Sequence, residues 1–468
     1  MSPMLKFDCG HLESLDARLY NFESIDPLHN PKLASFNQTL AHELGIKVEN
    51  EAEFIALHNG EYIVEGSKPY AYAYAGHQFG YFVPKLGDGR AINLGALNGQ
   101  HLQLKGAGRT KYSRDGDGRA VLRSSIREYL ASEAMHGLGI PTTRALSLIS
   151  SDTPVQREQV ERGAMVIRTT SSWMRFGSFE FAYLGKAKTQ KIQKLADFVI
   201  AQNYPHLQNE PDRYTQLYQN IVQSSADLIA LWQSVGFVHG VMNSDNMSII
   251  GETIDYGPYG FMESFERNFV PNLSDYTGRY SYENQPIMAQ WNLINLSKLF
   301  KLITNSIKVD EVTQSFMPQF KRTYTSKMQQ KLGILEPNKN DRALIKSLLD
   351  ALQADNIDYT LFFYYLSQDN QEQLNTMAKA SLTPWLTQYQ ERVSNTPLEQ
   401  RKALMQQHNP KYILRESMLN AAIAKANQDD FSGINELLHI IQNPFDEHQG
   451  YEHFLEPSPR IMGCSCSS

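Results

Sequence analysis

The sequence predicts an α+β fold in which a small β-rich lobe precedes a larger helical lobe. Strand-like alternation begins near residue 62 and is interrupted by a single helical stretch, whereas beyond residue 190 apolar residues recur mostly at helical spacing. Hydrophobic residues make up 41% of the 468 residues and aromatic residues 11%, which is enough for a large core. We place the N-terminal extension and β-rich lobe in residues 1–169 and the helical lobe in residues 170–468.

The first predicted elements are a helix and three strands. Residues 33–46 place Leu33, Phe36, Leu40 and Leu44 three or four apart, which predicts a helix. A strand is then predicted where the tyrosines of KPYAYAYAG alternate with alanines. Two further strands, 91–97 and 101–106, flank Asn98-Gly99, a pair typical of tight hairpin turns.

The remaining elements complete the β-rich lobe and build the helical one. Residues 123–136 carry an apolar stripe that ends at glycines and a proline, so we predict a helix there. Two strands are expected next, at 144–150 and 163–169. The helical lobe then contains helices at 189–203 and 213–235 and a series from about 290 to 441.

Composition excludes several classes of protein. Forty-four Lys and Arg against 50 Asp and Glu give a net charge of -6, so no basic face for nucleic acid is expected. Neither an apolar run of membrane-spanning length nor a signal peptide is recognisable, so we expect a cytoplasmic protein without a membrane partner. With only Cys9, Cys464 and Cys466, a disulfide scaffold is implausible, and any chemistry of the tail is redox chemistry.

The segment 236–257, GFVHGVMNSDNMSIIGETIDYG, is the richest in polar side chains that could do chemistry. Carboxylate and amide oxygens on a loop suit Mg²⁺, which takes few protein ligands and completes its shell with substrate phosphates. Asn246 and Asp255 are the candidate ligands. The alternative is ordinary turn formation, because Asp and Asn are common in loops.

The same segment matches the spacing of protein-kinase motifs. His239 to Asn246 spans the frame of H-R-D-L-x-x-x-N, and the triplet starting at Asp255 stands where D-F-G would. Val241 replaces the kinase catalytic Asp, so a kinase mechanism using that base is excluded. Asp245 is the nearest carboxylate able to accept a proton from a hydroxyl group.

Upstream, Lys105 ends a predicted strand and Glu128 lies on the following helix, in the order of the kinase lysine–glutamate pair. A kinase-type glycine-rich loop is missing. Three glycine-bearing segments, 86–90, 105–109 and 114–119, each with a nearby basic residue, could instead hold a triphosphate. Arg168 and Arg175 follow the last predicted strand, where binding and ordinary surface roles are equally open.

Eight segments carry a resemblance to the selenoprotein O (SelO, or YdiU in bacteria) family. They are YAGHQFG (74–80), LGDGRA (86–91), LKGAG (104–108), residues 117–146, HGVMNSDNMSI (239–249), TIDYGPYGFM (253–262), NPKYILR (409–415) and the terminal CSS. The resemblance implies a protein-kinase-like fold that transfers AMP from ATP to Ser, Thr or Tyr of other proteins, with UMP transfer from UTP also associated with bacterial members. Mg²⁺ or Mn²⁺ is the implied metal.

Carried over by position, the resemblance assigns a role to each candidate residue. Asn246 and Asp255 would hold the metal, Asp245 would accept the proton, and Glu128 would pair with Lys105. The implied nucleotide contacts are Gly87, Gly89, Arg90, Lys105, Asp117, Gly118, Arg168, Arg175 and Asp255.

The tail departs from the family pattern. Cys466 matches the position that is selenocysteine in eukaryotic members, and in some relatives it pairs with a cysteine after the DYG segment. Pro271 stands at that position here, so the same disulfide cannot form. Cys466 therefore stays a candidate redox residue whose second thiol would come from Cys464, Cys9 or a partner protein.

Two rival functions remain open from the sequence. One is a conventional kinase that uses Asp245 as a displaced base, and the other is a nucleotide-binding scaffold without activity, suggested by Val241. The kinase differs from an AMP-transferring enzyme in the phosphorus that is attacked, which is the γ-phosphorus in a kinase and the α-phosphorus in AMP transfer.

Overall fold

An antiparallel sheet forms the N-terminal part of the computed structural model, which describes residues 6–456. Its strands run in the order β1-β3-β5-β6-β9-β8-β2, with β4 added beside β3 and β7 beside β9. Their bounds are β1 Tyr20–Phe22, β2 Lys32–Phe36, β3 Tyr70–Gln78, β4 Tyr81–Gly87, β5 Ala91–Leu97, β6 Gln100–Lys105, β7 Ala120–Val121, β8 Arg144–Gln156 and β9 Val160–Thr170.

A tight hairpin turn and the pairing of β6 with the long strand β9 fix the register of the sheet. Asn98 and Gly99 form the turn of the β5–β6 hairpin, both with positive φ (51° and 79°), as the type I′ turn requires. Leu104 of β6 pairs with Ile167 of β9, so the end of β6 lies beside the middle of β9. This register sets Lys105 close to Arg168.

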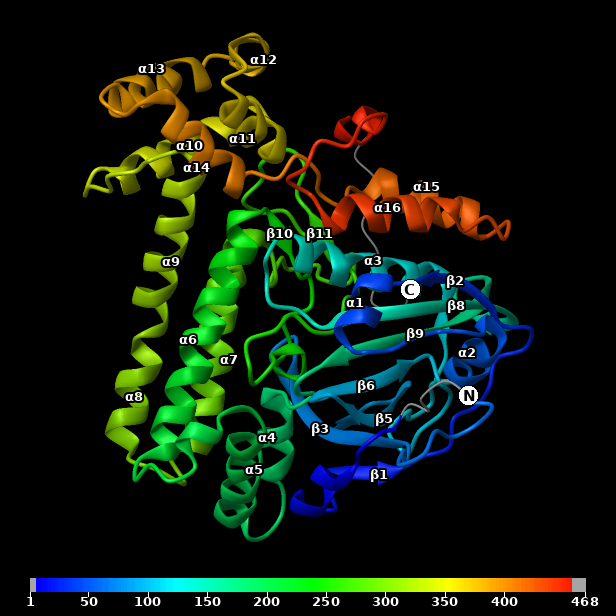
Figure 1. Cartoon of the computed structure of the whole chain (residues 1–468). Helices are drawn as coiled ribbons and strands as arrows, with labels where there is room; N and C mark the ends of the chain where they lie inside the picture. The colour runs from blue at the N-terminus through cyan, green and yellow to red at the C-terminus, as the bar shows by residue number, and fades with distance from the viewer. Residues whose placement is uncertain (1–5, 457–468) are drawn as a thin grey trace.

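Helix α3 (Leu122–Gly137) packs on this sheet and is covered in turn by the end of the chain. α3 contacts β8 and β9, and α15 (Glu416–Ala426) and α16 (Ser432–Gln442) lie over it (Figure 1). At Gly137 a Cβ would lie 2.1 Å from the Ile441 carbonyl oxygen, so only glycine permits this approach. Residues 300 positions apart thus form one layer.

The helical part lies beside the sheet, with α6 and α9 packed along each other (Figure 1). Short strands β10 (Phe237–Val238) and β11 (Gly260–Phe261) pair within it and bracket the loop that carries Asp245 and Asp255. Its helices are α4 Phe176–Ala182, α5 Lys188–Asn203, α6 Arg213–Ser234, α7 Gln285–Phe300, α8 Ser306–Gln314, α9 Phe316–Lys331, α10 Asp341–Asp355, α11 Tyr359–Gln368, α12 Gln371–Met377, α13 Leu382–Val393 and α14 Leu398–His408.

The predicted α+β class is confirmed, since helices accompany a sheet that the structure shows to be antiparallel, and most predicted elements are present. The helix predicted over residues 33–46 is wrong in its first part, because Leu33 and Phe36 lie in β2, which pairs with β8. The helix there is α1 (Gln38–Glu43), whose first turn is capped by the Asn37 side chain. A further helix, α2, spans Glu51–His58.

No helix within residues 6–456 is long and apolar enough to cross a membrane.

Candidate functional site

Three buried cations converge on the carboxylate of Asp255. Lys105 Nζ at the end of β6 lies 3.2 Å from Asp255 Oδ1, and Arg168 Nη1 from β9 lies 2.7 Å from the same atom. Arg175 Nη1, just before α4, lies 3.0 Å from Oδ2. Burial alone would raise the pKa of Asp255, but the three cations hold it well below its usual range. Asp255 is therefore an ionised carboxylate at the junction of sheet and helices.

Glu128 on α3 completes this cluster. Lys105 Nζ lies 2.7 Å from Glu128 Oε2, and Arg168 Nη1 lies 2.6 Å from Oε1. Burial lowers the pKa of Lys105, while Glu128 and Asp255 act to raise it. The structure thus brings together the lysine and glutamate that the sequence paired, and three cations face two carboxylates in a space from which water is largely excluded.

The two arginines are not surface residues, which settles the alternative that the sequence left open. Arg168 and Arg175 are 2% and 1% exposed. The Arg168 guanidinium lies 4.7 Å from the ring centre of Trp173, and that of Arg175 lies 4.3 Å from the ring centre of Tyr74. Asp88 lies 3.8 Å from Arg175. Aromatic faces and carboxylates therefore fix both guanidinium groups in place.

The backbone at Asp255 is strained. Its φ is +58°, in the left-handed region that residues other than glycine rarely adopt. The neighbouring Tyr256 is anchored by a hydrogen bond between its hydroxyl and Thr142. Strain of this kind persists only where the surroundings enforce it, and here it turns the Asp255 carboxylate towards the cations.

Asp245 lies beside this cluster, on the single 3₁₀ turn Ser244–Asn246. Its backbone oxygen accepts a hydrogen bond from Arg175 Nη1 at 3.0 Å, and its Oδ2 accepts one from Gln78 Nε2 at 3.3 Å. Oδ1 is buried and has no partner among the described residues. Burial raises the pKa of Asp245 to about 6, against the lowering effect of Arg175. A carboxylate with this pKa suits proton acceptance near neutral pH.

Asn246 has one side-chain atom left for a ligand. Its Nδ2 donates to the Val241 carbonyl at 3.0 Å, which leaves the amide oxygen as an acceptor. No group of three or more His, Cys, Asp or Glu that could hold a metal occurs in residues 6–456. One carboxylate from Asp255 and one amide oxygen from Asn246 fit a hard cation that takes its other ligands from phosphates and water.

Two glycine-bearing loops meet at the end of β6. Gly108 N donates to the Gly118 carbonyl at 3.1 Å, and a Cβ on Gly118 would lie 2.2 Å from Gly108. A Cβ on Gly87 would lie 2.4 Å from the Tyr112 ring, and one on Gly89 would lie 2.9 Å from the Tyr112 carbonyl oxygen. Glycine is required at these positions for close packing of the loops.

The remaining predicted contacts lie nearer the surface. Arg90 is exposed and lines a pocket together with Lys105, Glu128 and Gly257. The Asp117 carboxylate is not among the partners of Asp255 or Lys105, and it forms an ion pair with Arg157 at 2.6 Å. Arg90 thus lies next to the buried cluster. The Asp117 side chain does not contact Lys105 or Asp255, and only the neighbouring Gly118 connects it to the glycine-bearing loops.

Sequence reasoning missed a hydrogen-bonded network behind Asp245. Glu180 on α4 accepts from Ser244 Oγ at 2.7 Å and contacts His77 Nδ1 at 2.7 Å. His77 N also donates to Ser244 Oγ at 2.7 Å. His77 lies within the segment 74–80 used for the resemblance, but its partners are more than 100 residues away, so no local pattern indicates the network.

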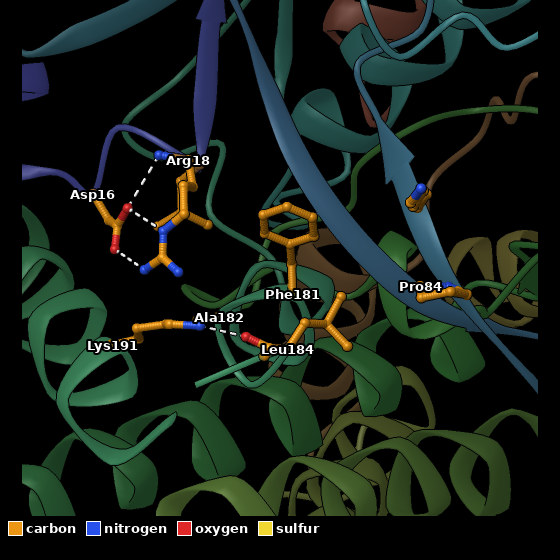
Figure 2. Close-up of a pocket in the computed structure, with 10 residues that line it drawn as sticks. Asp16, Arg18, Pro84, Phe181, Ala182, Leu184 and Lys191 are labelled. Atoms are coloured by element: carbon orange, nitrogen blue, oxygen red, sulfur yellow. Dashed lines mark hydrogen bonds and ion pairs between the residues drawn. The ribbon is translucent and has the colours of Figure 1, made fainter. Parts of the chain in front are cut away.

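A second cavity, of about 290 Å³, lies at the C-terminal end of α4, where Phe181, Ala182 and Leu184 line it. Figure 2 shows the ion pair of Arg18 with Asp16 above the Lys191 side chain, whose ammonium donates to the Leu184 carbonyl, with Phe181 to the right of both. None of the predicted site residues lines it. The candidate site is therefore the cluster around Asp255 and Asp245.

Cys464 and Cys466, and the predicted redox role of Cys466, lie outside the described residues. Cys9 is a free thiol that donates weakly to the Leu94 carbonyl at 3.7 Å, and burial raises its pKa. A raised pKa disfavours the reactive thiolate.

Comparison with known proteins places this site in a family context. Residues 4–442 match the family model described as protein adenylyltransferase SelO. The chain is 42% identical to the protein nucleotidyltransferase YdiU of Thioalkalivibrio sulfidiphilus over 94% of both chains. It is 41% identical to the protein of the same name from Erwinia tasmaniensis, over 94% of this chain and 96% of the relative. The Myxococcus xanthus protein is 40% identical over 94% of both.

Proposed function

Since the chain belongs to the family of the protein adenylyltransferase SelO, we propose that it transfers AMP from ATP to Ser, Thr or Tyr hydroxyls of other proteins and releases pyrophosphate. The observation that carries this proposal is the pairing of a buried three-cation cluster at Asp255 with a neighbouring carboxylate, Asp245, whose pKa is about 6. Nucleotidyl transfer needs both positive charge for a polyphosphate and a base for the acceptor hydroxyl.

The arrangement supports a protein-kinase-like fold of two lobes. Lys105 on the sheet and Glu128 on α3 form an ion pair, and the segment that starts at Asp255 follows the loop of Asn246, in the order that kinases use. His239, at the position of the motif histidine, is buried and bonds the Ile254 carbonyl at 3.0 Å through Nε2. This contact ties the loop of Asp245 to the segment of Asp255.

In this proposal the buried cations bind the polyphosphate, and the glycine-bearing loops let the nucleotide approach the backbone closely. Lys105, Arg168 and Arg175 would neutralise the β- and γ-phosphates, with Arg90 at the mouth of the adjoining pocket. Mg²⁺ or Mn²⁺, held by Asn246 and Asp255 when bound, would supply Lewis-acid stabilisation of charge on the phosphate oxygens. Gly87, Gly89, Asp117 and Gly118 stay proposed contacts of the nucleotide.

The proposed chemical step is a displacement at the α-phosphorus. The acceptor oxygen forms a bond to that phosphorus, the bond to the β-phosphate bridging oxygen breaks, and pyrophosphate leaves. The acceptor proton passes to the carboxylate of Asp245. Arg175 connects the two halves of the site, because it bonds the Asp245 backbone and the Asp255 carboxylate. Val241 stands at the position of the usual kinase base, and in this proposal Asp245 takes over the role of that base.

Label position in ATP tests the proposal. Incubation with lysate proteins and ATP labelled at the α-phosphate should label protein, whereas ATP labelled at the γ-phosphate should release labelled pyrophosphate only. Label transferred from the γ position alone would indicate a kinase, and no transfer with either metal would indicate a scaffold. Asp245→Asn is the matched control that should lower transfer by about 10² or more, and α-labelled UTP in parallel measures UMP transfer.

A further inference from the structure

Two turns frame Asp245 on the outside of the candidate site. The turn between β3 and β4 bonds the loop of Asp245, through Gln78 to the Asp245 carboxylate and through Phe79 N to Asn243 Oδ1 at 3.1 Å. A second turn bonds the same Asn243 oxygen through the Tyr280 hydroxyl at 2.7 Å. Residues 78–82 and 275–280 are therefore fixed to the segment that carries the proposed base, and we call them together the acceptor face.

Arg279 contributes a positive charge to the acceptor face without an ion-pair partner. Its guanidinium lies 4.9 Å from the ring centre of Trp291, and a Cβ on Gly80 would be 3.5 Å from its terminal nitrogens. No carboxylate within residues 6–456 lies within ion-pair distance of it. Asp275 bonds the backbone N–H groups of Arg279 and Tyr280, at 3.0 and 2.7 Å, rather than the guanidinium.

This arrangement leaves the guanidinium of the half-buried Arg279 between a backbone turn and an indole ring, with its Nε buried and its terminal nitrogens beside Gly80. Stacking orients the group at little further entropic cost, so its N–H edges are prepared for a planar anion such as a carboxylate. A charge that is fixed and not neutralised internally is the form of complementarity by which interfaces choose their partners.

The acceptor face also carries large exposed aromatic side chains. Tyr276 is 94% exposed, Tyr81 is 80% exposed and Phe82 is 43% exposed. Tyrosine and phenylalanine are enriched at protein interfaces, where they provide contact area with few rotatable bonds. Such residues on the turns that flank a proposed base offer contact area to a polypeptide rather than to a nucleotide.

We propose that the acceptor face docks the protein substrate and that Arg279 selects acceptor segments with an acidic residue near the modified hydroxyl. The inference rests on the proposed function. A hydroxyl that gives its proton to Asp245 must come within hydrogen-bond reach of it. Gln78 bonds the Asp245 carboxylate, so the chain that carries the hydroxyl passes over residues 78–82. Arg279 then faces the residues that flank the hydroxyl.

Short synthetic peptides test the charge preference directly. Three peptides carry one hydroxyl residue flanked by Glu, Gln or Lys, each made in Ser, Thr and Tyr versions, and transfer from α-labelled ATP is measured. We expect kcat/KM to be about fivefold higher for the Glu peptide than for the Gln peptide, as for a strong exposed ion pair, and lowest for the Lys peptide. Arg279→Gln should remove this preference.

Matched variants separate docking from chemistry. The double variant Tyr81→Ser, Tyr276→Ser should raise KM for all peptides about tenfold, with pyrophosphate release in the absence of acceptor unchanged. Tyr62→Ser, at an exposed tyrosine outside the acceptor face, is the control and should change neither.

The outcomes distinguish this proposal from the function on which it rests. Equal use of the three peptides, or an acidic preference that survives in Arg279→Gln, overturns the docking proposal. Labelling of lysate proteins without labelling of any peptide also counts against it. Failure of all AMP transfer, to proteins, to the enzyme itself and to water, contradicts the proposed function instead.

Discussion

Replacing Asp245 with asparagine should lower AMP transfer and, at alkaline pH, raise the free energy of unfolding. Burial raises the pKa of Asp245 from 3.8 to about 6, and Arg175 opposes this only in part. The folded protein therefore holds the proton more tightly than the unfolded chain does, and stability falls as the pH rises between these two values. A shift of about two units corresponds to a cost of about 3 kcal/mol above pH 6, most of which disappears near pH 4.

Asparagine carries no charge at any pH, so the variant escapes that cost. Its amide oxygen can still accept from Gln78. We expect Asp245→Asn to be about 1 to 3 kcal/mol more stable than the wild type at pH 8 and to differ by less than about 1 kcal/mol at pH 4. AMP transfer should fall by about 10² or more, since the proposed base is lost.

Urea unfolding at both pH values, followed by tryptophan fluorescence, measures the stability difference. Asp255→Asn is the control of opposite sign, because the pKa of Asp255 is held low by three cations and its removal should destabilise the protein at pH 8. A variant at Asp245 that is no more stable than the wild type at pH 8, or that gains equally at both pH values, refutes the reasoning.

Three further predictions test the surroundings of the site. Gly76→Ala should lower AMP transfer at least tenfold, because the added Cβ would lie 2.4 Å from Asp245 Oδ1 and displace that carboxylate. ATP binding, measured by fluorescence titration, should persist. Unchanged AMP transfer would contradict this prediction. Glu180→Ala should lower kcat by about 10- to 100-fold without raising KM for ATP. Glu180→Gln should recover part of this loss of kcat, since its side-chain oxygen still accepts from Ser244. Equal losses of kcat in the two variants would argue against a role of Glu180 in positioning the loop of Asp245. Burial lowers the pKa of Lys331 to about 7, so Lys331→Met should stabilise the protein by about 2 to 4 kcal/mol at pH 6 and less at pH 10, as urea unfolding would show.

Local patterns predicted the elements whose causes are local. Asn98-Gly99 forms its hairpin because the turn needs positive φ at both residues, and that requirement is visible in two letters. The strand at Leu33 is different, because it exists through pairing with β8 more than 100 residues away. Asn37, a good N-cap residue, was the one signal that could have moved the helix start.

The candidate site shows the same division. Lys105 and Glu128 could be paired from the sequence because a strand end and the next helix follow a known order. Asp88 was overlooked inside a glycine-bearing segment, although its buried carboxylate accepts from Tyr72 N at 3.1 Å and from two side-chain amides. Its role arises from strand register, which brings β5 and β6 beside it, and composition does not encode register.

The layer of α15 and α16 over α3 also has a consequence for synthesis on the ribosome. Arg127 on α3 pairs with Glu416 at 2.7 Å, and Ser35 of β2 bonds Asn435, so the helix that carries Glu128 rests on the last elements of the chain. A nascent chain that has emerged only to about residue 410 has a sheet whose covering helix lacks its outer layer. The helix that carries Glu128 therefore gains these contacts only when translation of the chain is nearly finished.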